Sequence, residues 1–176
     1  MIFTETGISG AYCIDLELIK DNRGFFARMW CEKEFKEHGL NSNLVQCNLS
    51  YNISRGTLRG MHYQSAPYEE AKLVTCIAGS IYDVILDLRR DSPTFRQWKA
   101  FELSASNYRM LYIPEGVAHG FQTLQDDTCV FYQLSDFYHP EAAWGVRWDD
   151  PSFGMEWPIT EKIMSKKDQA YDWWSE

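Results

Sequence analysis

Two histidines lie in strand-like segments rich in aromatic residues, and they are the first candidates for chemistry. His62 stands in RGMHYQ, residues 59–64, and His119 stands in PEGVAHGF, residues 114–121. An imidazole titrates near neutral pH, so it can move a proton or bind a metal ion. A single histidine on a strand is more often a hydrogen-bonded core residue. Two of them, each with arginine or glycine neighbours, favour a functional site.

The other two histidines give less functional signal. His38 comes just before Gly39, which is typical of a helix end, and His139 precedes Pro140 in a loop-like segment. We therefore expect His38 at the surface and assign no role to His139.

Few metal ligands accompany the two candidate histidines. The spacing from Pro114 to His119, Pro-x-Gly-x-x-His, resembles the second motif of the cupin proteins. A metal-binding cupin would carry His-x-His in the first segment, but this chain has His-Tyr-Gln at residues 62–64, and acidic residues come only at Glu69 and Glu70. Two histidines and one glutamine make a poor site for a divalent cation. We therefore expect no metal.

Short β-strands dominate the expected secondary structure and would have to position these residues. Alternating or β-rich runs, separated by turn-forming residues, predict strands at residues 12–19, 44–53, 58–64, 72–78, 81–88, 97–104, 110–113, 118–124 and 128–138. The clearest hairpin is expected at Gly79-Ser80, where a two-residue Gly-x loop suits a type II′ turn. Short helices are expected at residues 31–38 and near residues 160–170.

This pattern predicts a mainly β fold, an antiparallel sandwich or barrel with a few short helices. Several strands are apolar on both faces, which indicates that both faces are covered. A barrel with strands this aromatic could hold a small molecule in its interior.

Length and composition limit the classes of protein to consider. The chain has 176 residues, 45% hydrophobic and 15% aromatic, which fits one domain over residues 1–176 and excludes a disordered chain. The formal net charge of −8 argues against a nucleic-acid partner. The five cysteines form no Cys-x-x-Cys pair, the N-terminus lacks a signal-peptide pattern, and no apolar run approaches the roughly 20 residues that cross a membrane. We expect a soluble cytoplasmic protein with reduced thiols and no membrane partner.

An ordered series of short motifs makes the chain resemble the dTDP-4-dehydrorhamnose 3,5-epimerase family. No single motif is decisive, but their order along nearly the whole chain is specific. They are DNRGFF at residues 21–26, GTLRGMHYQ at 56–64, KLV at 72–74, DLR at 87–89, SPTF at 92–95, PEGVAHGF at 114–121, GVRWDDP at 145–151, WP at 157–158 and SKKD at 165–168.

The resemblance implies a metal-free, cupin-type jelly roll that is usually a homodimer. It also implies a substrate, a nucleoside-diphosphate 4-keto-6-deoxy sugar, that is inverted at C3, at C5 or at both. The C4 ketone acidifies the hydrogens on C3 and C5, but epimerisation still needs a base, a group that stabilises the enolate, and an acid on the opposite face. No nicotinamide or flavin is expected, because the chain has no glycine-rich dinucleotide fingerprint.

The resemblance assigns the proton chemistry to four residues. His62 would be the base, and Asp168 would fix its tautomer and stabilise the imidazolium. Tyr132 would return a proton on the other face, and Lys72 would neutralise the charge on the C4 oxygen. Without the resemblance, we would place Asp168 in an exposed polar tail and Tyr132 in the core.

Five further residues are implied in substrate binding. Arg23 and Arg59 would bind the diphosphate, because a guanidinium offers paired donors to phosphate oxygens. His119 would support the catalytic lysine or contact the sugar hydroxyls. Phe26 and Tyr138 would stack on the sugar or the nucleobase.

Three positions depart from the family pattern. Glu70 occupies a position where glutamine is common, Thr75 one where arginine is common, and Cys47 one that varies. The first two changes make the neighbourhood less basic, so they put the identity of the nucleotide and the sugar in question rather than the proton chemistry.

Three other functions stay open. A cupin sugar-nucleotide 3,4-ketoisomerase would share the fold and substrate but move the carbonyl. A metal-dependent cupin would bind a metal in stoichiometric amount. A non-catalytic sugar-nucleotide-binding cupin would exchange no substrate protons with solvent.

Overall fold

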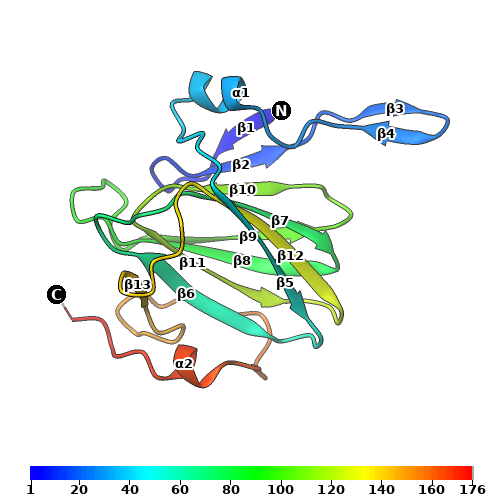
Figure 1. Cartoon of the computed structure of the whole chain (residues 1–176). Coiled ribbons are helices and arrows are strands. Elements are labelled where there is room, and N and C mark those ends of the chain that lie inside the picture. The colour runs from blue at the N-terminus through cyan, green and yellow to red at the C-terminus, as the bar shows by residue number, and fades with distance from the viewer. Residues whose placement is uncertain (176) are drawn as a thin grey trace.

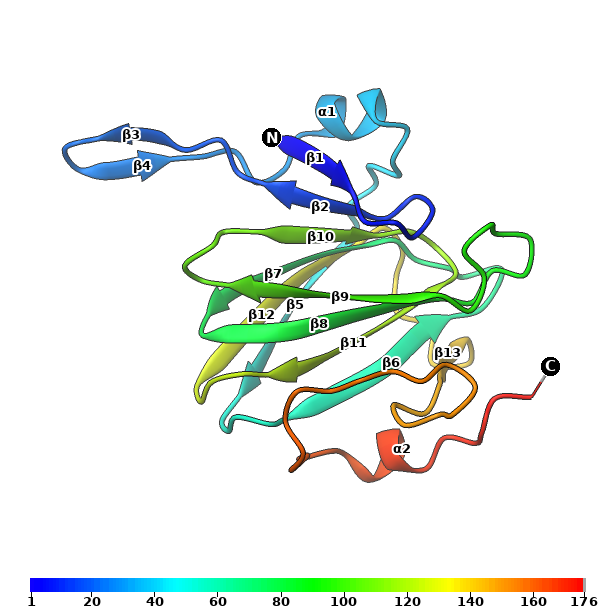
Figure 2. The ribbon, with the colours of Figure 1, turned by 180° about the vertical axis from the view of Figure 1, so that it is seen from behind.

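The computed structural model describes residues 1–175 as two antiparallel sheets that pack face to face, with a separate two-stranded arm (Figures 1 and 2). The larger sheet has the order β1-β2-β10-β7-β12-β5, with strands Ile2–Glu5, Tyr12–Asp15, Met110–Ile113, Lys72–Ala78, Thr128–Leu134 and Gln46–Asn52. The smaller sheet has the order β13-β6-β11-β8-β9, with strands Ala143–Gly145, Leu58–Gln64, Val117–Thr123, Ser80–Asp87 and Trp98–Ser104. The short helices are α1 (Glu32–Glu37) and α2 (Lys166–Gln169). The predicted fold class is therefore confirmed.

The chain crosses from one sheet to the other at Gly79, so the predicted hairpin was wrong. β7 pairs with β10 and β12, whereas β8 pairs with β11 and β9. Gly79 has a φ of 73°, and a Cβ built on it would lie 2.3 Å from Oγ1 of Thr128. A glycine therefore lets the chain turn close beside β12 as it changes sheets. The connections from β5 to β6 and from β11 to β12 change sheets at the same end of the molecule (Figure 1).

The ends of the predicted elements agree to different degrees. The strands at residues 58–64, 72–78 and 110–113 have the predicted bounds. The run at 12–19 is divided between β2 and β3, and the run at 128–138 ends early at Leu134. The helix expected near residues 160–170 shortens to one turn, α2, and β1, β13 and the arm were not predicted.

Apolar side chains cover both faces of the smaller sheet. Between the sheets lies a core that includes Ile85, Leu111 and Val130. On the other face of the smaller sheet, Met61 belongs to a second buried cluster together with Phe153. Both faces of the smaller sheet are therefore buried, as the apolar strands indicate. The core between the sheets does not fill the space beside β5 and β6, which stays open for a ligand.

The arm is the hairpin of β3 (Ile19–Asp21) and β4 (Gly24–Phe26), and it projects away from both sheets (Figures 1 and 2). Its apolar side chains are open to solvent, with Phe26 at 70% exposure. No helix within residues 1–175 is both long enough and apolar enough to span a membrane.

Candidate active site

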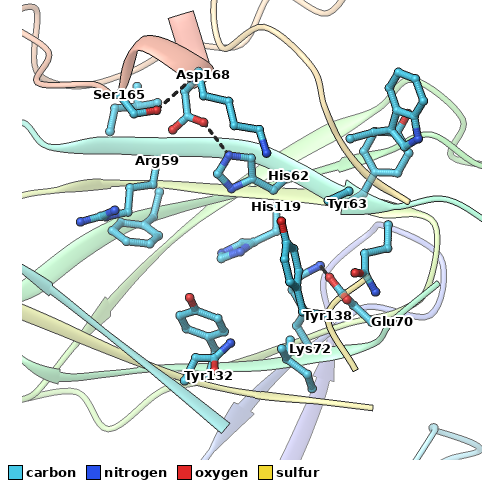
Figure 3. A pocket seen from close by; sticks show the side chains of 18 of the residues that line it. Arg59, His62, Tyr63, Glu70, Lys72, His119, Tyr132, Tyr138, Ser165 and Asp168 are labelled. Carbon is cyan, nitrogen blue, oxygen red and sulfur yellow. Dashed lines mark hydrogen bonds and ion pairs between the residues drawn. The ribbon is translucent and has the colours of Figure 1, made fainter. Parts of the chain in front are cut away.

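A cavity of about 620 Å³ lies between the two sheets, beside β5 and β6. Its walls come from β5, β12 and the start of β7 in the larger sheet, from β6 and β11 in the smaller sheet, and from the segment around α2. It brings together seven of the nine predicted site residues (Figure 3): Arg59, His62, Lys72, His119, Tyr132, Tyr138 and Asp168.

His62 and Asp168 form a hydrogen-bonded pair on one wall. Nε2 of His62 lies 2.7 Å from Oδ1 of Asp168. Ser165 caps α2 by accepting the N–H of Asp168 on its Oγ at 3.0 Å, which places the carboxylate. Burial opposes charge on Asp168, but interactions with His62, the Gly60 backbone and Ser165 outweigh it and lower the pKa of Asp168. A charged carboxylate that is 6% exposed thus orients an imidazole that is 44% exposed.

His119 lies beside His62 in register on the neighbouring strand β11. Its Nε2 is 2.5 Å from Oδ1 of Asp83 on β8. Asp83 is fully buried, and its Oδ2 has no hydrogen-bond partner within the described part of the chain. Burial raises the pKa of Asp83, and His119 offsets this only in part. His119 is therefore held in the sheet by a partner that resists ionisation.

Lys72 reaches the cavity from the first position of β7 and forms an ion pair there. Its Nζ lies 2.7 Å from Oε1 of Glu70, and the two side chains are 9% and 8% exposed. Glu70 also lines the cavity. The acidic residue that departs from the family pattern therefore contacts the predicted catalytic lysine directly.

Tyr132 stands on β12, in the sheet opposite His62 (Figure 3). Burial raises the pKa of Tyr132, which the charge of Arg59 partly offsets. The phenol is therefore protonated at neutral pH, as a proton donor must be.

Arg59 and Tyr138 line the cavity with a guanidinium, which suits an anion, and an aromatic ring, which suits stacking. Nε of Arg59 donates to Oδ1 of Asn52 at 2.7 Å, which fixes the guanidinium on β6. Tyr138 follows β12, is exposed, and donates its backbone N–H to Oε1 of Gln46 at 3.3 Å.

Arg23 and Phe26 are not brought to this cavity. Both lie at the arm, and neither lines the cavity. The Arg23 side chain is 85% exposed, and its guanidinium pairs with Asp21 at 2.6 Å. One chain alone therefore separates these two residues from the other seven predicted site residues.

Several residues of the cavity wall were not predicted. Lys167 lies in the SKKD motif beside Asp168, so that motif was a usable signal for it. Trp144 pairs with Tyr63 across β13 and β6 and lies in a strand too short to show alternation. The other wall residues outside the predicted set include Gln46, Asn48 and Tyr171.

The arrangement suits proton transfer between two walls. A histidine with its carboxylate faces the cavity from the smaller sheet, and a protonated phenol and a lysine face it from the larger one. Among residues 1–175, no three His, Cys, Asp or Glu side chains are grouped so that they could hold a metal ion.

Known proteins resemble this chain over nearly its full length. The sequence model of a family described as dTDP-4-dehydrorhamnose 3,5-epimerase matches residues 5–176. A dTDP-4-dehydrorhamnose 3,5-epimerase of Methanothermobacter thermautotrophicus is 42% identical over 172 residues, which are 96% of this chain and 92% of the relative.

Two solved structures share the fold. The dTDP-4-dehydrorhamnose 3,5-epimerase from Elizabethkingia anophelis NUHP1 matches with a TM-score of 0.96 at 38% identity, covering 98% of this chain and 96% of that one. The dTDP-6-deoxy-D-glucose-3,5-epimerase from Legionella pneumophila Philadelphia 1, in complex with dTDP-4-keto-L-rhamnose, matches with a TM-score of 0.91 at 37% identity, covering 98% and 92%.

Proposed function

The chain belongs to the dTDP-4-dehydrorhamnose 3,5-epimerase family, and from this we propose that it inverts C3 and C5 of a dTDP-4-keto-6-deoxy sugar. The enzyme is an isomerase. One observation carries the mechanism: the His62–Asp168 pair and Tyr132 line one cavity from opposite sheets. The reaction is redox-neutral, because one proton leaves a carbon beside the C4 ketone and another returns to it.

His62 takes the proton from C3 or C5. The C–H electrons move into the enolate, and the imidazole becomes an imidazolium beside the negative charge of Asp168. The distance of 2.7 Å lets the carboxylate fix the ring and stabilise its charged form. A positioned base of this kind contributes roughly 10²–10⁴-fold to a rate.

Lys72 and Tyr132 complete the inversion. Lys72 stabilises the negative charge that forms on the C4 oxygen. Tyr132 donates its phenolic proton to the carbon from the face opposite His62. The Tyr132 phenolate then takes a proton from solvent, and the His62 imidazolium releases its proton to solvent. Both residues thereby return to their starting protonation states.

The anionic diphosphate of the substrate needs positively charged side chains close by, because the chain as a whole carries a net charge of −8. Arg59 and Lys167 line the cavity and can contact the diphosphate, and the exposed ring of Tyr138 can stack on the base. The relative from Legionella pneumophila, which binds a dTDP sugar, supports a dTDP-linked substrate.

We also propose a homodimer in which each arm reaches the cavity of the other chain. Exposed apolar side chains lie on the arm, at Phe25 and Phe26, and on the larger sheet, at Leu49, Tyr51 and Ile77. Phe25 and Ile77 line the same pocket, which links the two groups. A surface of this kind favours a protein interface. Such a dimer would place Arg23 near a bound diphosphate. Sedimentation should give the mass of two chains, and Arg23→Ala should raise KM more than it lowers kcat.

A cytoplasmic location also remains a proposal. All five cysteines lie within the described residues and are free thiols, of which Cys13 and Cys76 are buried. Free thiols persist in a reducing compartment. Fractionation of the source cells would test the location.

The experiment is incubation with a dTDP-4-keto-6-deoxyhexose in deuterium oxide, followed by NMR of the sugar. Deuterium at C3 and C5 with inverted products supports the proposal, and label at one carbon would restrict it to that carbon. Movement of the carbonyl would show a 3,4-ketoisomerase, and absence of exchange would favour a binding protein. Activity lost on chelation, with stoichiometric metal, would show a metal-dependent cupin.

Tyr132→Phe separates the two halves of the mechanism. Proton removal by His62 should continue, so deuterium still enters the substrate. Inversion should fall, because the proton then returns on the face from which it left. Equal loss of exchange and inversion would contradict the assignment of Tyr132 as the acid.

A further inference from the structure

The ring of Tyr171 fills the space beside His62 that the neighbouring strand leaves empty. On β13 the residue in register with His62 is Gly145, which offers no side chain. Directly paired residues have Cβ atoms about 4.5–5.5 Å apart, so a side chain at residue 145 would normally pack next to His62. The Tyr171 ring lies there instead, edge-on to the imidazole, with centroids 6.2 Å apart and an interplanar angle of 70°.

Gly145 is needed for this packing because any larger residue would collide with the ring. A Cβ built on Gly145 would lie 2.2 Å from both Cε2 and Cζ of Tyr171. Its φ is not in the left-handed region. The reason for glycine here is therefore space, not backbone conformation.

The chain on both sides of Tyr171 is held to the loop that follows β13. The guanidinium of Arg147 lies 4.2 Å from the ring centroid of Trp173 and donates to the carbonyl of Gln169 at 2.8 Å. The backbone N–H of Trp174 donates to Oδ2 of Asp150 at 2.6 Å. The contact at Gln169 holds the end of α2, and the contacts at Trp173 and Trp174 hold the chain beyond Tyr171.

The same segment carries the carboxylate of the His62 pair. Asp168 lies in α2, whose four residues make it too short to be stable by itself. Its position therefore depends on contacts on both sides, the Ser165 cap before it and the packed ring of Tyr171 after it.

We propose that Tyr171 is a positioning residue for the base, and this rests on the proposed role of His62. The ring limits the rotation of the imidazole, holds α2 so that Asp168 meets Nε2, and keeps water away from the carboxylate. The hydroxyl is buried without a hydrogen-bond partner within residues 1–175, so the ring and not the hydroxyl does this work.

The decisive comparison is Tyr171→Ala with Tyr171→Phe. In Tyr171→Ala we expect kcat to fall about tenfold with little change in KM, and the primary isotope effect on C–H cleavage to rise, because misplacement of a reacting group slows the chemical step. Tyr171→Phe keeps the ring and should stay within about twofold of wild type. It should be no less stable, since it removes an unsatisfied buried hydroxyl.

A second measurement does not require turnover. In wild type the Nε2–H proton of His62 should be visible by NMR and slow to exchange, because it is bonded to Asp168. Tyr171→Ala should make it exchange quickly, and Tyr171→Phe should not. If the protein proved not to be an epimerase, this signal would still decide whether Tyr171 positions the pair.

Gly145→Ala tests the same contact from the other side. The methyl group should displace the ring and reproduce the loss seen in Tyr171→Ala. The double variant should be no worse than Tyr171→Ala, because residues in contact are not additive. Tyr82→Ala is the control, since Tyr82 packs on Trp157 on the outer face of the same sheet, does not line the cavity, and should leave the His62 signal intact. A folded Tyr171→Ala with wild-type kcat and slow exchange at His62, or additive losses in the double variant, would overturn the proposal.

Discussion

The two histidine–aspartate pairs lie side by side on neighbouring strands, yet they differ in exposure and charge. His62 and His119 are in register on β6 and β11. The side chain of His62 is 44% exposed, whereas that of His119 is 10% exposed. The pKa of Asp168 is lowered, whereas the pKa of Asp83 is raised.

The difference comes from the element that carries each carboxylate. Asp83 lies in β8, between β11 and β9, where the backbone donors are used by the strand pairing, so burial dominates. Asp168 lies at the start of α2, where Ser165 and a backbone N–H supplement His62. A histidine–aspartate pair suits base catalysis only where the carboxylate stays charged and the ring stays open to the ligand. Here that is the His62 pair, whose carboxylate lies outside the sheet, in α2.

The largest expected effect separates the two histidines. His62→Asn should lower kcat about 10³-fold and abolish deuterium incorporation at both carbons, because it removes the base that takes the proton in the proposed mechanism. His119→Asn should lower kcat/KM only about tenfold and keep deuterium exchange, because His119 supports the lysine or the sugar hydroxyls and does not take the substrate proton. Steady-state kinetics and NMR of the product would measure both. Equal losses would remove the distinction drawn between the pairs.

The next effect separates the two aspartates. Asp168→Asn should lower kcat about 10²-fold with KM nearly unchanged, since an amide neither fixes the imidazole tautomer nor stabilises the imidazolium. Asp83→Asn is the matched control, and its effect on kcat should be at least several times smaller. A kcat of Asp168→Asn close to wild type would show that His62 needs no charged partner.

A smaller effect comes from the third pair, Lys72 and Glu70. Glu70→Gln keeps the shape of the side chain but removes an anion that repels the diphosphate, so KM should fall about two- to fivefold. The free enzyme should lose thermal stability, because Lys72 keeps a buried charge without its partner. Bound dTDP should then raise Tm more than it does in wild type. A higher KM in Glu70→Gln would mean that the carboxylate binds the sugar.

The smallest effect is the pH dependence of stability, which should have opposite signs for the two aspartates. The pKa of Asp168 is below its ordinary value of 3.8, so its stabilisation is complete above that pH and is lost as the pH falls through the lowered pKa. The pKa of Asp83 is above 3.8, so its contribution is complete below that pH and is lost as the pH rises.

Urea unfolding of wild type and the two asparagine variants would measure these contributions. The stability gap between wild type and Asp168→Asn should narrow as the pH is lowered below about 4. The gap between wild type and Asp83→Asn should narrow as the pH is raised above about 4. The same trend in both variants would contradict the assigned directions.

Much of the site was predictable because its residues lie in ordered local motifs. His62 and His119 stand out by residue type within short β-rich segments, and the strands at 58–64 and 72–78 have the predicted bounds. Asp168 and Tyr132 were found only through the motif order, since a polar tail residue and one of ten tyrosines carry no local signal. Neither the alternation of apolar and polar residues along a strand nor the composition of the chain predicts which residues line the same cavity.

The features that local motifs did not predict have physical causes of the same kind. The Gly79-Ser80 turn marks a reversal of the chain but not which sheet the next strand joins, because pairing depends on distant strands. Arg23 lies in a motif with the right residue types, but the motif does not state that the arm points away from the sheets within one chain (Figure 1), so its role in binding stays a prediction. Tyr171 has no local pattern at all, since its partner is an absent side chain at Gly145, 26 positions earlier in the chain.

The sequence by itself determined the β-rich class, the residue types for acid–base chemistry and, through ordered motifs, the family. These features are local: strand periodicity, turn chemistry and imidazole acidity depend on a residue and its near neighbours. Only the tertiary structure decided that the side chain of His62 is exposed while that of His119 is buried, that Glu70 pairs with Lys72, and that the ring of Tyr171 packs against His62. Burial, pKa and ion pairing depend on groups far apart in the chain, and those groups meet only when the sheets and the C-terminal segment have packed.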